Sequence, residues 1–319
     1  MAEKAAKRSR DGLGVALVWG LLGLFARLPL GFHLRLFRAV SWYLEKIHHY
    51  RRDELMINLS RSFPEKKYKE LKTIRHEVYV HLGDLMAEAI WMSGCRGKKG
   101  RGLRRFHRSH IVEVLNVKDM NELYDESPSI MILCGHLGNW EILPGLMEMN
   151  YDEEHPWHAR ARDLAFVYKE VHSHLWDRII ARNRGLIIKL RDPDYDGYQD
   201  SNRMLRYALE HRNEKRLYVF PADQFPYKGA VRHDIGTFMN QPTMAMLGGP
   251  ALAAKLGMAV VYTRWTRIRR GRYTIEFVPI TRNAKEMDPL EISRRYHALL
   301  EEDLHRQPEN YLWTHKRWK

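Results

Sequence analysis

Between residues 33 and 93, apolar residues recur every three or four positions, which is the spacing of an amphipathic helix. The clearest stripe follows Phe63-Pro64-Glu65, where the proline interrupts helical hydrogen bonding. The pattern therefore predicts that residues 33–93 are helical. The stripe consists of Leu71, Ile74, Val78, Leu82, Leu85 and Ala89.

From Ser129 onward the pattern changes to short apolar runs that alternate with helical stretches. This alternation predicts a layered α/β fold, with a mixed, mostly parallel sheet flanked by helices on both faces. The last apolar run alternates with polar residues, so we expect its strand at an edge of the sheet. The predicted strands are Ile130–Cys134, Leu164–Tyr168, Leu186–Leu190, Leu217–Pro221, Ala259–Thr263 and Tyr273–Val278, and the predicted helices are Trp140–Met149, Val171–Arg184, Ser201–His211, Thr243–Leu256 and Pro289–Arg306.

The N-terminus combines positive charge with an apolar run. A basic stretch between Lys4 and Arg10 precedes the run from Leu13 to Ala26, which Arg27 and Pro29 interrupt. A perpendicular bilayer span needs about 20 apolar residues, and this run is shorter. We therefore expect an interfacial or shallowly inserted helix with its cationic end on the cytoplasmic side. The alternative is a core helix of a soluble domain.

Composition and charge narrow the class of protein. The chain has 319 residues, 45% of them hydrophobic, and a formal net charge of +14. Such a charge favours a polyanionic partner, which is nucleic acid, an anionic membrane surface or an acidic carrier protein. The two cysteines, Cys95 and Cys134, form no C-x-x-C pair, which excludes a disulfide scaffold and favours a reducing compartment.

A basic, glycine-rich segment spans residues 94–108. It lacks the spacing of a dinucleotide or P-loop fingerprint, so it is either a surface linker or a ligand contact. His76-Glu77 is followed by His81 rather than by a histidine four residues after the first. The two rings would lie on different helical faces, and a zinc site is not expected there.

The most informative chemistry follows the predicted strand Ile130–Cys134, where the chain continues Gly135-His136-Leu137-Gly138-Asn139-Trp140-Glu141. The pattern H-x4-[DE] occurs six times in the chain. Only His136 follows a buried strand, however, and it would emerge at the carboxyl edge of the sheet, where open α/β folds build their sites. The pattern indicates a general base, His136, oriented by Glu141. The alternative is a structural histidine.

These residues belong to a set of blocks that resembles the late lipid A acyltransferases of Gram-negative bacteria (the lauroyl/myristoyl transferase family), within the glycerolipid acyltransferase superfamily. The similarity covers the chain from about Tyr50 to its end. Its order and spacing are more specific than any single block. The blocks are GHLGNWE; Val167-Tyr168-Lys169 with Leu175-Trp176-Asp177 and Arg184; Pro221-Ala222-Asp223-Gln224; Phe238–Pro242 with Pro250-Ala251-Leu252-Ala253; and Pro308–Lys319.

The resemblance implies an acyltransferase domain over residues 31–319, preceded by a membrane-anchoring segment over residues 1–30. It implies transfer of a fatty acyl chain from an acyl carrier protein thioester to a hydroxyl of a lipid A precursor, without a cofactor, at the cytoplasmic face of the inner membrane. By position His136 and Glu141 match the family's catalytic pair, and Arg184 and Asp223 match an arginine and an aspartate of the same site.

The sequence departs from the family pattern in three places. These changes affect the expected acceptor and acyl-chain length more than the expected reaction. Met239 and Asn240 replace residues of a Phe-Phe-Gly type stretch, and the Asp223-Gln224 block continues with Phe225-Pro226. Gly185 comes early after Arg184, so Arg182 is a rival for the arginine role. Arg184 either binds phosphate or a phosphopantetheine arm, or is a helix C-terminal cation.

Acyl transfer from a thioester needs a base, an oxyanion donor and aligned substrates. We expect His136 to take the proton of the attacking hydroxyl, since a histidine pKa near 6.5 suits that task. Glu141 would fix the tautomer, and the backbone N–H of Gly138 or Asn139 would bind the oxyanion. The chain has no G-x-S-x-G elbow, and Cys134 is either a nucleophile or a small buried strand residue.

Some alternatives stay open at this stage. Asp223 either serves the site or forms a turn, and Tyr311, Trp313 and Trp318 form either an interfacial belt or a packed chain end. The acceptor is a lipid A precursor, an amino-lipid or a glycosylated phospholipid. A non-enzymatic protein that binds nucleic acid or an anionic membrane is the rival class. No nucleic-acid motif supports it, so we expect no nucleic-acid partner.

Overall fold

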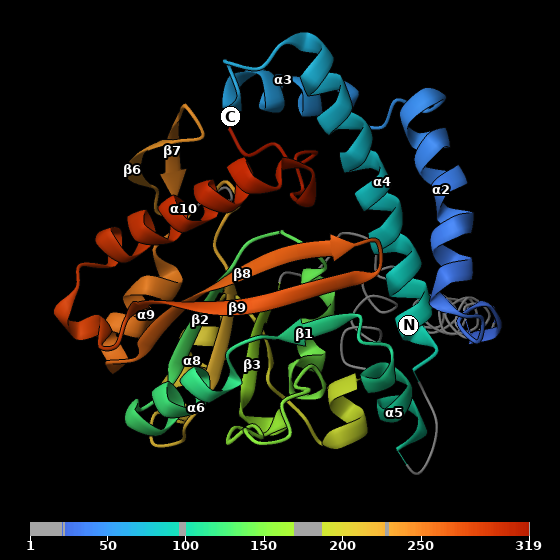
Figure 1. The fold of residues 1–319 in the computed structure, drawn as a ribbon. Helices are drawn as coiled ribbons and strands as arrows, with labels where there is room; N and C mark the ends of the chain where they lie inside the picture. Colours follow the sequence, from blue (N-terminus) through green and yellow to red (C-terminus); the bar gives the residue numbers. More distant parts are fainter. Residues whose placement is uncertain (1–20, 22, 96–99, 169–186, 227–229, 319) are drawn as a thin grey trace, which may run out of the picture.

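A seven-stranded sheet forms the centre of the molecule in the computed structural model, which describes residues 21, 23–95, 100–168, 187–226 and 230–318 (Figure 1). Its strand order is β1-β9-β8-β2-β5-β3-β4. Every neighbouring pair is parallel except β8 and β9, which form an antiparallel hairpin. The strands are β1 (Val112–Val114), β2 (Ile130–Cys134), β3 (Leu164–Tyr168), β4 (Tyr198–Asp200), β5 (Leu217–Pro221), β8 (Ala259–Arg269) and β9 (Arg272–Thr281).

Strand β2 lies in the middle of this sheet, between β5 and β8. Ile132 is in register with Val219 on one side and Val261 on the other. All five residues of β2 are buried, as expected of an apolar run covered on both faces. The strand is therefore a rigid support for the residues that follow it.

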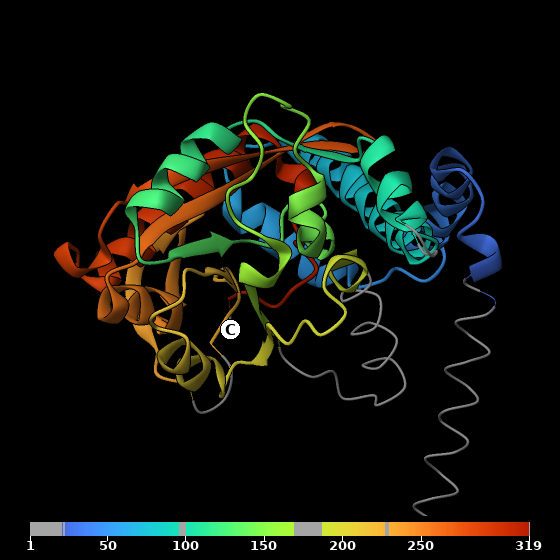
Figure 2. The ribbon, with the colours of Figure 1, turned by 90° about the horizontal axis from the view of Figure 1, so that it is seen from below.

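Helices cover the sheet, and two of them, α2 and α4, lie beside it on one side. In both views α2 and α4 lie side by side, and α4 runs along the end of the β8–β9 hairpin (Figures 1 and 2). Helix α10 contacts β8 and β9 from above in Figure 1. The α-helices are α2 (Leu30–Lys46), α3 (Arg52–Ser62), α4 (Tyr68–Ser93), α5 (Arg101–Arg108), α6 (Val117–Glu126), α8 (Met204–Glu210), α9 (Gly248–Leu256) and α10 (Pro289–Arg306), with 3₁₀ turns η1 (Trp140–Glu148), η2 (Ala161–Asp163), η3 (Ala284–Glu286) and η4 (Pro308–Asn310).

The predicted fold class is confirmed, since the structure is a mixed α/β fold with a mostly parallel sheet. The helical prediction for residues 33–93 is confirmed by α2, α3 and α4. The strand prediction Leu186–Leu190 is wrong, because residues 187–191 are helical. A short apolar run fits a buried strand or a helical turn equally well. The predicted helix Val171–Arg184 lies outside the described residues.

A further prediction about the sheet is wrong. Strand β9 is not an edge, because β1 pairs with it in parallel through Val112 and Tyr273. A three-residue strand such as β1 leaves too weak a pattern to be found in the sequence. In the basic segment over residues 94–108, the second half forms α5, and the choice between a surface linker and a ligand contact stays open.

A separate hairpin replaces the first part of the predicted helix Thr243–Leu256. Strands β6 (His233–Phe238) and β7 (Gln241–Ala245) are antiparallel, and helix α9 begins only afterwards. Met239 and Asn240 form the two-residue turn with φ of 51° and 60°. Positive φ at both central residues marks the turn that fits a twisted hairpin, and asparagine tolerates it well. The Asn240 side chain also donates to the Ser62 carbonyl.

The first described residues place an apolar face next to positive charge. Leu28, Phe32, Leu36, Tyr43 and Ile47 are exposed apolar side chains of α2 and its flanks. The exposed charged residues from position 23 to 47 are all basic, namely Arg27, Arg35, Arg38 and Lys46. Most of the predicted anchor Leu13–Ala26 lies outside the described part of the chain. Within that part, no helix has the length and apolar character that a membrane crossing requires.

Candidate active site

Two adjacent parallel strands bring the candidate catalytic residues together. His136 follows β2 and Asp223 follows β5, and Cys134 is in register with Pro221 at the ends of these strands. Because both strands run in the same direction, the residues after them meet at the carboxyl edge of the sheet. The site therefore joins two segments that lie 87 residues apart.

Asp223 holds both the ring and the backbone of His136. The ring nitrogen Nδ1 lies 2.7 Å from Oδ1 of Asp223, and the backbone N–H donates to Oδ2 at 2.9 Å. Asp223 is 1% exposed, whereas the His136 side chain keeps 14% of its surface. Burial by itself would raise the pKa of Asp223, but the charge of His136 and these two bonds lower the pKa to about 2. The carboxylate is thus ionised beside the ring.

The side-chain amide of Gln224 bonds to the other ring nitrogen of His136. Its Nε2 lies 2.9 Å from Nε2 of His136. Since Nδ1 faces a carboxylate, the neutral ring carries its proton on Nδ1 and offers the lone pair of Nε2 to the Gln224 amide. This tautomer is the one that a general base needs, because the lone pair of Nε2 points away from the orienting acid.

Glu141 lies in η1, five residues after His136, and is half-buried. From its spacing, Glu141 is predicted to fix the tautomer of the His136 ring. In the structure the carboxylate bonded to Nδ1 is that of Asp223. The ring of Trp140, which precedes Glu141, packs edge-on against the His136 ring at a centroid distance of 4.8 Å. A catalytic role for Glu141 stays a prediction.

The loop between His136 and Trp140 depends on a glycine. Gly138 has a φ of +55°, and a Cβ added to it would lie 2.5 Å from Cε3 of Trp265. Both the backbone conformation and the close approach exclude a larger residue. Its N–H donates to the Asn310 carbonyl at 3.0 Å. The Gly138 N–H is therefore already bonded, and an oxyanion donor in this loop, from Gly138 or Asn139, stays a prediction.

A buried carboxyl group holds the next residue of the loop. The Asn139 side chain donates to Oε2 of Glu88 at 2.6 Å, and the Tyr273 hydroxyl donates to Oε1 at 3.1 Å. Glu88 lies on α4 and has no exposed surface. Burial raises the pKa of Glu88 to about 8, although the bonds from Asn139 and Tyr273 oppose this shift. Glu88 is thus largely neutral near pH 7.

The C-terminal segment packs against the loop that carries His136. Leu137 and Tyr311 form an antiparallel bridge, and the N–H of Leu312 donates to the His136 carbonyl at 3.1 Å. Burial and the nearby charge of Asp223 raise the pKa of Tyr311. Tyr311 and Trp313 are 3% and 1% exposed, which confirms a packed chain end rather than an aromatic belt for these two residues. Trp318 stacks on Phe238 and is half-buried.

Cys134 is not placed to act as a nucleophile. It is 2% exposed, and burial raises its pKa far above the usual range of a thiol. Its carbonyl accepts bonds from the Tyr296 hydroxyl and the Ala222 N–H. Because the thiolate is the reactive form of cysteine, a buried neutral thiol is inert. Cys134 is a small core residue of β2.

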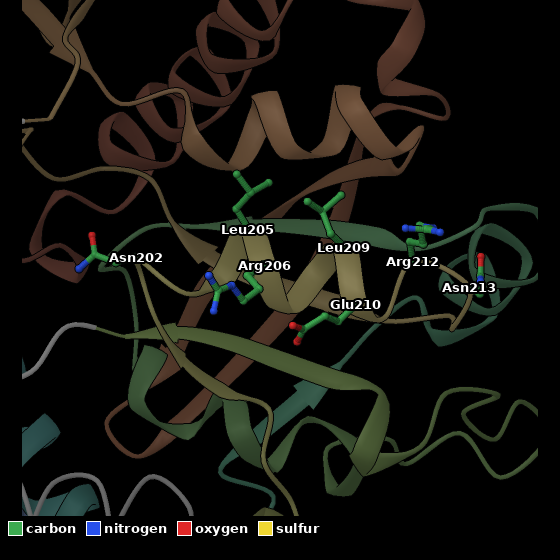
Figure 3. A pocket seen from close by; sticks show the side chains of 7 residues that line it. All are labelled: Asn202, Leu205, Arg206, Leu209, Glu210, Arg212 and Asn213. Atoms are coloured by element: carbon green, nitrogen blue, oxygen red, sulfur yellow. The ribbon is translucent and has the colours of Figure 1, made fainter.

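The two candidate arginines, Arg182 and Arg184, lie outside the described residues. A hollow of about 590 Å³ lies over α8 (Figure 3). Its lining does not include His136. Helix α8 leads into the amino end of β5, whereas His136 and Asp223 lie at the carboxyl edge. None of the residues predicted from the sequence to carry the chemistry lines this hollow. Its lining residues are Asn202, Leu205, Arg206, Leu209, Glu210, Arg212 and Asn213.

Sequence reasoning missed three residues around His136. Gln224 was detectable, because it follows Asp223 in the segment after a strand. Tyr311 lies in the C-terminal block, but its contact with the loop depends on how the chain end folds back. Glu88 has no local signal, because a glutamate on a helix usually faces solvent.

The fold and site define an α/β enzyme with a histidine–aspartate pair at the carboxyl edge of a parallel sheet. The chain matches the family model of bacterial lipid A biosynthesis acyltransferases over residues 4–319. It therefore belongs to this family, and it is an acyltransferase of lipid A biosynthesis. A search of the curated proteins found no match.

Proposed function

We propose that the protein transfers a fatty acyl chain from an acyl carrier protein thioester to a hydroxyl of a lipid A precursor, with His136 as the general base. The observation that carries the proposal is the bond from His136 to Asp223, which leaves Nε2 as the proton acceptor. The Nε2 atom accepts from the side-chain amide of Gln224, and the His136 side chain keeps 14% of its surface. The family membership supports an acyl donor and a lipid acceptor.

The reaction needs no covalent enzyme intermediate. The acceptor hydroxyl displaces the Gln224 amide from Nε2 of His136. As the hydroxyl oxygen attacks the thioester carbonyl, Nε2 takes the hydroxyl proton. Asp223 stabilises the resulting imidazolium. The carbon–sulfur bond breaks, and the thiolate leaves with the proton from His136. Gln224, once displaced, donates its N–H to the carbonyl oxygen as negative charge develops there.

We further propose that the enzyme works at the cytoplasmic face of the inner membrane. The exposed apolar side chains of α2 and its flanks lie among exposed cations without an exposed acid, as in helices that rest on anionic membranes. A membrane position would bring a lipid acceptor to the carboxyl edge of the sheet. Leu24 and Phe25 continue the same apolar surface.

The experiment is a reconstituted assay with acyl carrier proteins that carry different acyl chains and a purified lipid A precursor. Mass spectrometry of the product reports the added chain and the acceptor. We expect the protein with its natural sequence to transfer the acyl chain. The His136→Ala variant should lose transfer and keep vesicle binding. Turnover that survives in His136→Ala would refute the proposed base. Vesicle binding that is lost at high salt, in a protein that transfers no acyl chain, would favour a non-enzymatic basic protein.

A further inference from the structure

A second hollow, of about 420 Å³, opens where α3 and α4 begin. It contains none of the residues of the candidate active site. Arg75 and Arg52 line it together with Asp53 and His49. Met56 and Tyr68 complete the lining.

Arg75 is a buried cation whose hydrogen bonds are largely unmade. The residue is 6% exposed, yet among the residues that the structure describes its Nε and Nη1 have no hydrogen-bond partner. Its ion pair within these residues is a long contact of 3.5 Å between Nη2 and Oε1 of Glu45. A buried donor without a partner costs about 1–3 kcal/mol, and more when the group is charged. The hollow beside Arg75 is where a missing acceptor would fit.

Glu45 is the partner of Arg75, but two other side chains share its carboxylate. Its Oε2 lies 2.6 Å from Nδ1 of His76, and its Oε1 lies 3.1 Å from Nζ of Lys46. Both contacts are shorter than the one to Arg75, so Glu45 pairs less closely with Arg75 than with these two side chains. Glu45 therefore balances the guanidinium charge of Arg75 only in part.

The rest of the lining adds positive charge. Arg52 is half-buried, and within the described part of the chain it makes no ion pair. Asp53 is the acid of the lining, but it is exposed, so water screens its charge. Helix α3 begins at Arg52 without a side-chain cap. The Arg52 N–H donates to the His49 carbonyl, so the positive end of the helix dipole, rather than that N–H, is what the helix start contributes. Two guanidinium forks next to a helix start match the geometry of a phosphate.

We propose that this hollow binds a phosphate group, separately from the catalytic pair. The source is either the headgroup of an anionic membrane lipid or a soluble phosphate. Position favours the lipid, because the exposed residues Tyr43 and Ile47 end the apolar surface of α2 just before the hollow. The inference does not depend on the proposed acyl transfer, since neither His136 nor Asp223 contributes to the hollow.

The test uses the full-length chain with His136→Ala, so that catalysis plays no part. Isothermal titration with inorganic phosphate at low salt should show saturable binding. Arg52→Ala should weaken it at least about 10-fold, because a charge-assisted hydrogen bond is lost. Arg75→Lys should weaken it too, since it keeps the charge but loses the fork. If the Arg75 variant does not fold, Arg52→Ala carries the test.

Arg61→Ala is the matched control. Arg61 lies on α3, is exposed, and follows Arg52 by nine residues, which places it on the opposite face of the helix. It removes the same charge from the same helix, so phosphate binding should stay unchanged. Equal losses in Arg52→Ala and Arg61→Ala, or absence of saturable binding, would overturn the proposal.

Vesicles separate the two sources of phosphate. Phosphatidylglycerol vesicles should compete with inorganic phosphate, and their binding should fall more in Arg52→Ala than in Arg61→Ala. Phosphatidylcholine carries the same phosphate in a headgroup without net charge. Its vesicles therefore test whether the phosphate group alone is enough for vesicle binding. Saturable phosphate binding without competition by either vesicle would support the site with a soluble phosphate as its ligand.

Discussion

Asp223 bonds to His136 twice, with one carboxylate oxygen on the ring Nδ1 at 2.7 Å and the other on the backbone N–H at 2.9 Å. The ring therefore cannot rotate without losing its orienting acid. The same carboxylate also fixes the start of the loop that carries Gly138 and Asn139. One buried side chain thus sets both the tautomer of the base and the path of the chain around it.

Asp223→Asn should lower kcat about 100-fold or more and leave the KM for the acceptor nearly unchanged. An amide keeps the shape of the carboxylate but cannot stabilise the imidazolium that forms during attack. Steady-state assays of Asp223→Asn beside Glu141→Gln measure the contribution of each acid. Full activity in Asp223→Asn, with the loss found in Glu141→Gln instead, would return the orienting role to Glu141.

Gln224 is expected to act in the chemical step. Gln224→Ala should reduce kcat about 100-fold through loss of the oxyanion donor, with little change in the fold. Gln224→Glu keeps the size but places a negative charge beside Nε2, which favours the protonated ring. The acidic limb of its pH–rate profile should therefore move to higher pH. Unchanged kcat in Gln224→Ala would show that another donor serves the oxyanion.

Glu88 should make stability depend on pH in an unusual direction. Its pKa is about 8 in the folded chain and about 4.5 when unfolded, so the unfolded chain loses this proton first. This contribution therefore lowers the free energy of unfolding as pH rises from about 5 to 8, by a few kcal/mol in all. Glu88→Gln stays neutral, so it should gain stability relative to the natural chain as pH rises.

Urea unfolding at pH 5 and pH 8 measures this difference. Glu77→Gln is the control, because Glu77 lies on the same helix but is half-exposed. Its difference from the natural chain should be the same at both pH values. A constant difference for Glu88→Gln as well would mean that Glu88 is ionised in the folded protein, held by Asn139 and Tyr273.

Gly138→Ala should destabilise the protein by about 2 kcal/mol or more and abolish most of the activity. The new Cβ would meet Trp265 at 2.5 Å, and the positive φ adds backbone strain. Thermal unfolding and the transfer assay measure both effects. Gly236→Ala separates the two causes, because Gly236 has a φ of +89° with nothing within 4 Å of an added Cβ. Equal losses in the two variants would attribute the effect to strain alone.

The sequence located the site because local patterns carry that information. The apolar run of β2 predicted a buried parallel strand, and such a strand releases the next residue, His136, at the carboxyl edge of the sheet. The same reasoning applied to β5 and Asp223. Where the local pattern was ambiguous, as at residues 187–191 and in the β6–β7 hairpin, the prediction was wrong, because short apolar segments fit more than one secondary structure.

Only the tertiary structure shows which acid lies at Nδ1 of His136. Spacing along the chain suggested Glu141, five residues away, whereas the order of the sheet places β5 beside β2 and brings Asp223 to Nδ1 across 87 residues. Glu88 and Tyr311 reach the loop from α4 and from the chain end in the same way. Periodicity reports which face of an element is buried, but the partner on that face is set by strand order and helix packing, which join segments distant in sequence.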